Sequence, residues 1–279
     1  MKLDEFRKDH NVEGFVKYFS CYLKTWEVRY VSKNKRISVE DRNFHAAGIE
    51  EATKNYIWPA SVGEEKICRW DKTSQKLIEL SASLISSLRQ SASDTKNICD
   101  KIIDWGMGSR GGSAKTYLDK TDLKNYLINT RKAIDQDDIS KITCTLFDKM
   151  GSGLAKIHAL ANPGKLVILD SRVALAAGHA ILEYLNHRKY NGKVPEHLNI
   201  GYCDHGRKPE DQNRSMKLLP RNHKWLIAQL KLSWLLRLTL EEDKTIFGGH
   251  EEATRLHMLE AGLFMFGADK AALEESSKA

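Results

Sequence analysis

The stretch from residue 149 to residue 176 reads KMGSGLAKIHALANPGKLVILDSRVALA, and it decides how we expect the chain to fold. A glycine-containing break at 150–153 precedes an apolar helical stretch over 154–161. The Asn-Pro-Gly sequence that follows ends this helix, because proline lacks an N–H and restricts the residue before it. After a short extended piece, Asp170 stands at an N-cap position, where aspartate is a preferred residue. The stretch therefore predicts two helices joined by a short extended segment.

The apolar residues outside this stretch also recur at helical spacing. One such series consists of Leu77, Ile78, Leu80, Leu84, Ile85 and Leu88, and its period predicts a helix with a polar face. Further helices are expected at 12–26, 39–56, 73–88, 94–105, 122–134, 138–149, 171–187, 223–240 and 250–266. The sequence therefore predicts an all-α fold.

The chain divides by composition into three regions. We expect an N-terminal helical segment of unclear role at 1–70, a helical domain at 71–267 and a flexible tail at 268–279. The domain carries a basic, irregular insertion at 188–221. This insertion is either a phosphate-binding segment or a solvated surface loop.

Composition indicates a globular protein with a polyanionic partner. The chain has 279 residues, 41% of them hydrophobic, a net charge of +7 and a pI near 9.0. This hydrophobic content is enough for a buried core. Lysine and arginine bind phosphates and release their counterions, so double-stranded DNA is the expected partner. Mild basicity is also common among proteins that do not bind nucleic acid.

The five cysteines are scattered and form no Cys-x-x-Cys pair. This pattern argues against a disulfide framework and against structural zinc. The cluster Cys203-Asp204-His205 has metal-like chemistry but lacks a second ligand pair, so we expect no metal, and nothing indicates another cofactor. No apolar run is long enough for a signal peptide or a membrane span. A cytoplasmic monomer without membrane association is the expectation.

The residues around the 150–153 break are candidates for phosphate binding and catalysis. A turn containing Gly151, Ser152 and Gly153, followed by a helix N-terminus, binds phosphate through backbone N–H groups. A plain interhelical turn has the same sequence. At the start of a helix, where the dipole favours a negative charge, Asp170 is suited to stabilise a developing cation or to orient water. Arg172 is positioned to reach a phosphate or to pair with an acid.

The run Ala155-Lys156-Ile157-His158, the Asn162-Pro163 pair and the run from Ile168 to Val173 together resemble the core of prokaryotic 8-oxoguanine glycosylase-like proteins. These proteins belong to the helix–hairpin–helix DNA glycosylase superfamily. The Trp-Gly pair at 105–106 and the sequence LEAGLFMFG at 259–267 are also similar to elements of the group. The resemblance extends, with gaps, over 98–267, and its specific part is Asp-Ser-Arg-Val at 170–173.

The resemblance implies two helical subdomains flanking a cleft, a hairpin that grips the DNA backbone, and Asp170 as catalytic carboxylate with Lys156 as candidate amine. The chain departs from the superfamily in its hairpin, where Met-Gly-Ser-Gly replaces the usual Leu-Pro-Gly-Val-Gly. The lysine of bifunctional members falls near Gly151. Lys149 and Lys156 therefore compete for a Schiff-base role, and lyase activity stays open.

A glycosylase must flip its target base out of the stack into a pocket. Beside Lys149 and the Gly-Ser-Gly turn, Arg110 and Arg172 are the expected DNA contacts. An apolar or aromatic side chain would fill the gap in the duplex, and planar side chains would hold the base. The candidates for wedge or pocket are Trp105, Met107, His158 and Phe264. For each of these side chains, core packing is the more common role.

The expected reaction is hydrolysis of an N-glycosidic bond, which leaves an abasic site. One hypothesis is antiviral restriction, in which the enzyme removes a hypermodified base, such as glucosylated hydroxymethylcytosine, from phage DNA. The alternative is base-excision repair of oxidised purines such as 8-oxoguanine. A second alternative is a helical module that binds DNA without catalysis. A third is a helical protein that mediates other interactions and whose positive charge does not serve DNA binding.

Overall fold

The computed structural model describes residues 1–58, 68–119, 122–142 and 150–276, and this part of the chain is predominantly helical. The all-α expectation is confirmed at this level. Helices α1 to α5 span Leu3–Arg7, His10–Thr25, Ile49–Lys54, Trp70–Ser87 and Ala92–Met107. Helices α6 to α9 span Gly112–Leu118, Leu123–Asp135, Ser152–Ala161 and Ser171–His187, and α10 to α12 span His223–Glu242, Glu252–Phe266 and Lys270–Ser276.

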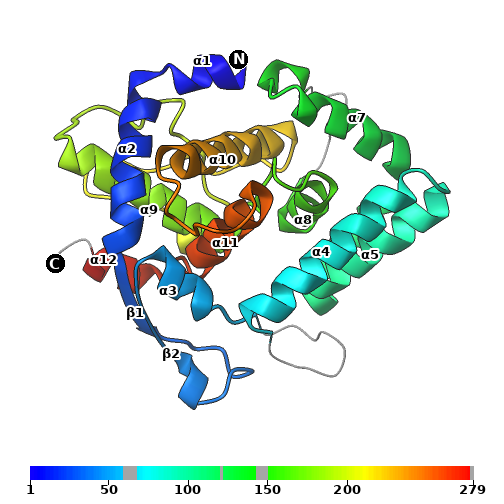
Figure 1. Cartoon of the computed structure of the whole chain (residues 1–279), viewed down its shortest axis with the longest axis horizontal. Coiled ribbons are helices and arrows are strands. Elements are labelled where there is room, and N and C mark those ends of the chain that lie inside the picture. The colour runs from blue at the N-terminus through cyan, green and yellow to red at the C-terminus, as the bar shows by residue number, and fades with distance from the viewer. Residues whose placement is uncertain (59–67, 120–121, 143–149, 277–279) are drawn as a thin grey trace.

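Helices α8, α9, α10 and α11 form the centre of the molecule, with α2 along one side and the α4–α5 pair along the other (Figure 1). Most residues of these four helices are buried, as expected for helices that are apolar on more than one face. Buried side chains from all four belong to one continuous hydrophobic core. The core thereby holds the start of α9, where Asp170 lies, against α11.

The N-terminal segment contains a β-hairpin that the sequence did not predict. Strand β1 (Glu27–Val31) pairs antiparallel with β2 (Asn43–Ala47). The helix expected at 39–56 is therefore wrong for most of its length, and only its last part forms α3. Alternating burial along β2 and the stacking of Tyr30 on Phe44, with ring centroids 4.8 Å apart, stabilise the pairing.

The α4–α5 pair follows the sequence prediction closely. A capping box accounts for the start of α5. The Ser91 side chain accepts a hydrogen bond from Asp94 N, and the Asp94 side chain accepts one from Ser91 N. The glycine-rich segment after α5 forms the 3-10 helix η2 (Gly108–Gly111) and then α6. Part of the helix expected at 138–149 lies outside the described residues, and its first residues form the 3-10 helix η3 (Ile139–Lys141).

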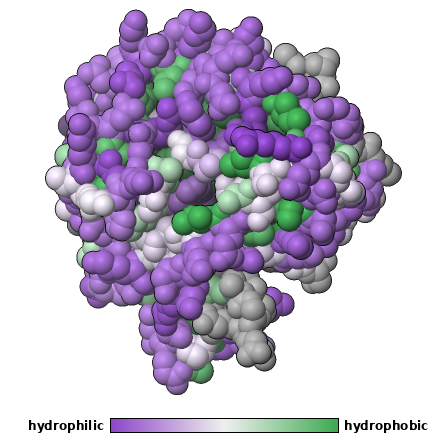
Figure 2. Space-filling view, turned by 45° about the vertical axis from the view of Figure 1, so that its right-hand side comes forward, coloured by the Kyte–Doolittle hydropathy of each residue, from purple (hydrophilic) through white to green (hydrophobic). Residues whose placement is uncertain are grey.

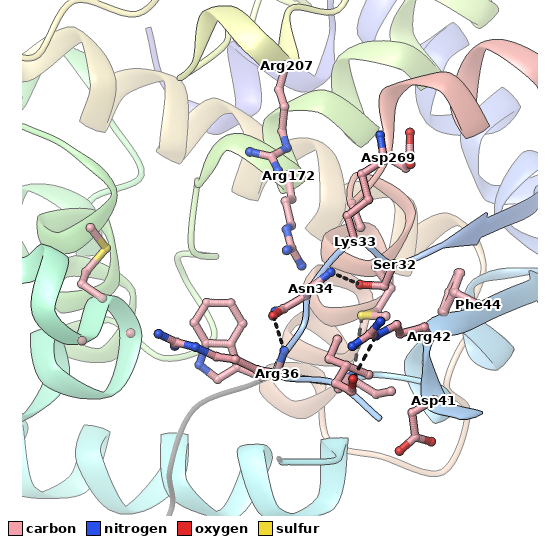
Figure 3. A pocket seen from close by; sticks show the side chains of 18 of the residues that line it. Ser32, Lys33, Asn34, Arg36, Asp41, Arg42, Phe44, Arg172, Arg207 and Asp269 are labelled. Atoms are coloured by element: carbon pink, nitrogen blue, oxygen red, sulfur yellow. Dashed lines mark hydrogen bonds between the residues drawn. The ribbon is translucent and has the colours of Figure 1, made fainter. Parts of the chain in front are cut away.

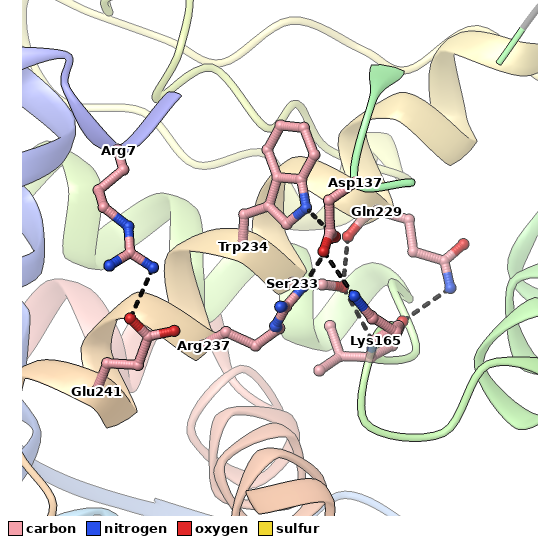
Figure 4. A network of polar contacts seen from close by, with 9 residues as sticks. Arg7, Asp137, Lys165, Gln229, Ser233, Trp234, Arg237 and Glu241 are labelled. Atoms are coloured by element: carbon pink, nitrogen blue, oxygen red, sulfur yellow. Dashed lines mark hydrogen bonds and ion pairs between the residues drawn. The ribbon is translucent and has the colours of Figure 1, made fainter. Parts of the chain in front are cut away.

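A partly buried ion cluster joins the end of α7 to α10 (Figure 4). Asp137 accepts hydrogen bonds from Lys165 at 2.6 Å and from Arg237 and Trp234 at 2.9 Å each. Its backbone carbonyl also accepts from Leu3 N at 3.0 Å. Burial raises the Asp137 pKa, but these donors outweigh that effect and lower it overall. The cluster ties the N-terminus of the chain to the central helices.

The insertion at 188–221 is irregular, as expected, but it is not a solvated loop along its whole length. Leu198, Ile200 and Met216 are buried in the main core. The expected tail at 268–279 is also ordered for most of its length, since Lys270–Ser276 forms α12 with Leu273 only 1% exposed. Burial of the apolar residues in both segments stabilises their conformations.

The surface is largely hydrophilic, and hydrophobic side chains gather near the middle of the face that Figure 2 shows. Val31, Val39 and Ile78 are the most exposed large hydrophobic residues of the described chain, with 63%, 70% and 64% of their surface accessible. Two of them belong to the β-hairpin segment. None of the described helices has the length and apolar character needed to cross a membrane.

Candidate functional site

A small aromatic pocket lies where α4, α5, α8, α9 and α11 meet. Its volume is about 30 Å³, which is room for about two water molecules. A planar ring would therefore enter only if the surrounding side chains moved. We call it the aromatic pocket, and its lining residues are Tyr56, Trp58, Trp70, Leu77, Trp105, Lys156, Ile168, Asp170, Val173, Glu260, Ala261 and Phe264.

Asp170 is the N-cap of α9, as the sequence predicted. Its Oδ1 accepts hydrogen bonds from Arg172 N at 2.9 Å and Val173 N at 3.0 Å. No described residue donates to Oδ2. The helix dipole favours a negative charge at this end of α9, and both bonds fix the carboxylate plane. One oxygen therefore anchors the side chain while the other is available at the aromatic pocket.

Lys156 lines the same pocket from α8 and is only 5% exposed. Its Nζ donates to Ser152 O at 3.4 Å. The aliphatic part of the chain lies against Gly106 of α5, where a Cβ atom would come within 2.3 Å of Cδ. The glycine of the Trp-Gly pair therefore makes room for the Lys156 side chain. The structure thus brings the two predicted catalytic residues together.

Glu260 is a second carboxylate at the pocket, and the sequence analysis did not select it. It lies on α11, is 8% exposed, and its Oε2 accepts from Ile168 N at 2.8 Å. His257 Nδ1 lies 3.5 Å from the same oxygen. Burial of a carboxylate is costly without such partners. A lone acid within the apolar run LEAGLFMF was the signal that could have identified it.

Five aromatic side chains surround these polar groups. Trp105 and Phe264 were predicted. Trp58 contacts both, with ring centroids 6.3 Å from Trp105 and 5.3 Å from Phe264. Tyr56 lies 5.7 Å from Phe264 and 5.8 Å from Trp70. Tyr56, Trp58 and Trp70 were not predicted, because their segments meet the predicted core only through tertiary packing.

Arg172 connects the aromatic pocket to a larger opening. Its guanidinium carbon lies 4.5 Å from the centre of the Phe264 ring, which is cation–π geometry. Burial lowers the Arg172 pKa, and the nearby Asp170 charge opposes this effect. The main chain approaches closely here as well, since a Cβ at Gly267 would lie 1.8 Å from Arg172 O. Gly267 thus lets the end of α11 pack against the start of α9.

The larger opening is a cleft of about 1300 Å³, which we call the basic cleft. Its walls come from the β1–β2 loop, from α4 and α5, and from the starts of α9 and α12 (Figure 3). Trp58 and Trp105 line both the cleft and the aromatic pocket. Eight of its described lining residues are cationic and four are aspartates: Lys33, Arg36, Arg42, Lys76, Lys101, Arg172, Arg207, Lys270, Asp41, Asp104, Asp204 and Asp269.

Two of the predicted wedge or pocket residues lie elsewhere. Met107 lines the basic cleft. His158 is fully buried on the other side of α8, where Tyr126 Oη lies 2.6 Å from its Nε2. Burial lowers the His158 pKa to about 3, so the ring is neutral at physiological pH. The structure therefore makes His158 part of the core contact between α7 and α8.

The predicted phosphate-binding turn forms the start of α8. Gly151 is its N-cap with an extended backbone, φ 179°, so this position does not need glycine for its conformation. Ser152 Oγ lies 3.6 Å from Met107 Sδ, and Gly153 is buried. The turn thus packs beside the basic cleft. Lys149 and the side chain of Arg110 lie outside the described part of the chain.

The metal expectation concerned the cluster at 203–205. Among the described residues no group of three or more His, Cys, Asp or Glu side chains could hold a metal ion. Burial raises the Cys203 pKa, and the negative charge of Asp170 adds to this effect. The thiol is accordingly protonated at physiological pH.

Comparison of the chain with protein-family models, with curated proteins and with solved structures gave no match. The function is therefore inferred from the residues and geometry of the aromatic pocket and the basic cleft.

Proposed function

We propose that this protein is a DNA glycosylase of the helix–hairpin–helix type, which flips out a modified base and hydrolyses its N-glycosidic bond. The observation that carries this proposal is that Asp170 and Lys156 line one aromatic pocket, and that this pocket shares Trp58 and Trp105 with a basic cleft. The arrangement provides a carboxylate, an amine, planar side chains and phosphate-binding charge in adjacent places. The resemblance of the 98–267 region to glycosylases agrees with it.

Asp170 is the proposed catalytic carboxylate. Departure of the base leaves positive charge on the sugar, and a fixed anion stabilises that charge without reorganisation. The two backbone donors on Oδ1 hold the group in place, so Oδ2 is free to face the sugar or a water molecule. Water then adds to the anomeric carbon and loses a proton, while the base leaves with its bonding electron pair and is protonated. An abasic site remains.

Lys156 has two possible roles. As a nucleophile, a neutral Nζ would attack the anomeric carbon while the base leaves with the electron pair of the glycosidic bond and is protonated. Loss of a proton from the nitrogen and opening of the sugar ring, whose oxygen becomes a hydroxyl, would then give a Schiff base, a precondition of lyase activity. As a positioning group, it would orient the substrate or water beside Asp170. Borohydride reduction of a reacting mixture distinguishes the roles. A trapped protein–DNA adduct that Lys156→Ala abolishes would assign the nucleophile, whereas hydrolysis without an adduct would assign positioning.

A hypermodified base is the favoured substrate, as in restriction of phage DNA such as that containing glucosylated hydroxymethylcytosine. The basic cleft of about 1300 Å³ beside the aromatic pocket supports this preference, because a bulky polar substituent on the base needs room and hydrogen-bonding groups. An oxidised purine such as 8-oxoguanine is the alternative. It requires only a planar slot with a few specific polar contacts.

The deciding experiment incubates the protein with duplexes containing 8-oxoguanine and, separately, with native glucosylated phage DNA. Abasic sites are then counted with an aldehyde-reactive probe. Release of the modified base from phage DNA alone would support restriction, and abasic sites in the 8-oxoguanine duplex alone would support repair. If neither substrate yields abasic sites above an Asp170→Asn control, these two substrate proposals are wrong.

A module that binds DNA without catalysis is the second candidate. The aromatic pocket of about 30 Å³ favours this alternative, since it is closed to a base as it stands. This candidate predicts that Asp170→Asn changes neither DNA binding nor any cellular effect of the protein. The glycosylase proposal predicts that binding is kept while excision is lost.

A further inference from the structure

The loop between β1 and β2, residues 32–42, forms one wall of the basic cleft. Ser32, Lys33, Asn34, Arg36, Ile37, Asp41 and Arg42 all line it. Figure 3 shows this loop facing Arg172 and Arg207, which enter the cleft from the opposite side. The N-terminal segment thus contributes charge directly beside the aromatic pocket.

Hydrogen bonds within the loop give it a defined shape. Ser32 N donates to Arg42 O at 2.8 Å and closes its base. Arg36 N donates to Asn34 Oδ1 at 3.0 Å, and Arg42 Nε donates to Ile37 O at 3.0 Å. Ile37 is 8% exposed and anchors the loop. The loop is therefore organised before any ligand binds, which lowers the entropic cost of binding.

The cations of this wall have no acidic partner among the described residues. Lys33 and Arg36 have exposed side chains, and neither they nor Arg42 form an ion pair with a described residue. On the other walls, Lys101 and Arg172 likewise form no ion pair within the described part of the chain. Cations that form no ion pair within the described ranges therefore face one cleft from separate elements.

The acids of the cleft do not cancel this charge. Asp41 pairs with Arg69 at 2.6 Å, and Asp104 pairs with Lys115 at 2.7 Å. Asp204 lies 3.5 Å from Arg207. The fourth, Asp269, accepts from Ala271 N at the start of α12. The low-dielectric walls focus the remaining positive field into the opening.

We propose that the 32–42 loop grips the phosphodiester backbone of the DNA strand whose nucleotide enters the aromatic pocket, opposite Arg172. This inference rests on the proposed function in that it requires the chain to bind DNA. The cations enter the cleft from different elements (Figure 3). A chain of phosphates can contact several cations on different walls at once, which a single small anion cannot do. Trp58 and Trp105 connect the cleft to the pocket, so a bound strand would pass the pocket entrance.

The test compares the salt dependence of DNA binding for two double variants. Lys33→Ala with Arg36→Ala removes two cations of the loop, and neither side chain supports the fold. Lys8→Ala with Lys132→Ala is the matched control, because both lysines are exposed and form no ion pair with a described residue. Lys8 is the C-cap of α1 and Lys132 lies in α7, and both helices are at the end of the molecule opposite the hairpin (Figure 1).

Dissociation constants for an unmodified duplex are measured by fluorescence anisotropy between low and physiological salt. Each lost phosphate contact should reduce the slope of log K against log salt by about 0.9. The slope for the loop variant should thus be smaller than the wild-type slope by about 2, and the variant should bind DNA roughly tenfold more weakly at low salt. The control should match the wild type. The single variant Arg36→Lys, which retains the charge, should keep most of the wild-type slope.

Two results would overturn the proposal, and they differ in their meaning for the enzyme. If the loop variant and the control have the same slope while the wild type binds and excises, the loop does not contact phosphate and the proposed function stands. If the wild type does not bind DNA at any salt concentration, both the loop contact and the glycosylase proposal are wrong. Thermal unfolding of each variant verifies that the fold is unchanged.

Discussion

Replacement of Asp170 separates its structural role from its proposed catalytic role. The structure shows that Oδ1 caps α9 through two backbone N–H groups, while Oδ2 receives no hydrogen bond from a described residue. Asparagine keeps the oxygen that caps the helix but has no charge. Alanine removes both the cap and the charge. The two substitutions should therefore have different effects on stability and the same effect on catalysis.

The magnitudes follow from the two contacts. Loss of an N-cap oxygen costs about 1 kcal/mol, and asparagine is as good a cap as aspartate. Asp170→Ala should therefore lower the melting temperature by roughly 3 °C in a chain of this size, and Asp170→Asn should lower it by less than about 1 °C. Removal of a preorganised group that stabilises transition-state charge typically costs about 10²–10³ in rate. Both variants should lose excision by at least that factor.

Differential scanning fluorimetry gives the melting temperatures, and single-turnover release of the base gives the rates. Duplex binding, measured in parallel, should be unchanged in the asparagine variant. If Asp170→Asn excises at the wild-type rate, the carboxylate charge has no part in the reaction and our assignment fails. If Asp170→Asn unfolds as early as Asp170→Ala, the capping account is wrong.

Three further predictions concern the surroundings of the site. Gly106→Ala should displace the Lys156 side chain, since the new Cβ would lie 2.3 Å from Cδ; excision or borohydride trapping should fall while melting changes little. Asp137→Asn should destabilise the fold by about 2 kcal/mol in urea titrations at neutral pH, because it leaves Lys165 and Arg237 without their anion. The donors lower the pKa of Asp137 in the folded protein. The stabilisation by its carboxylate is therefore fully present above the pKa of the unfolded state and is lost as the pH falls through the pKa of the folded state. In acid, the stability of the variant should approach that of the wild type. Burial lowers the His158 pKa from 6.5 to about 3. Between these two pH values the unfolded state binds a proton that the folded state does not, so stability should fall as the pH drops from 6.5 to about 3. His158→Gln should weaken this pH dependence in unfolding titrations at several pH values.

Most of the helices could be predicted because their information is local. The apolar period that predicted 73–88 and 223–240 is realised in α4 and α10, since a helix needs only one continuous apolar face. The β-hairpin could not be predicted in this way. Its strands are paired across an intervening loop, and strand preference depends on the neighbours that a segment meets. The ordering of α12 likewise depends on burial of Leu273 against other elements.

The sequence by itself determined the cap at Asp170, because an N-cap is decided by a side chain and the two or three residues that follow it. It also determined the predominance of helix and the excess of positive charge. Only the tertiary structure decided that Lys156 and Glu260 meet Asp170 among Tyr56 and Trp58, and that the hairpin loop faces Arg172 across the basic cleft. The physical reason is that a pocket is a product of packing between distant segments, whose approach depends on the whole core.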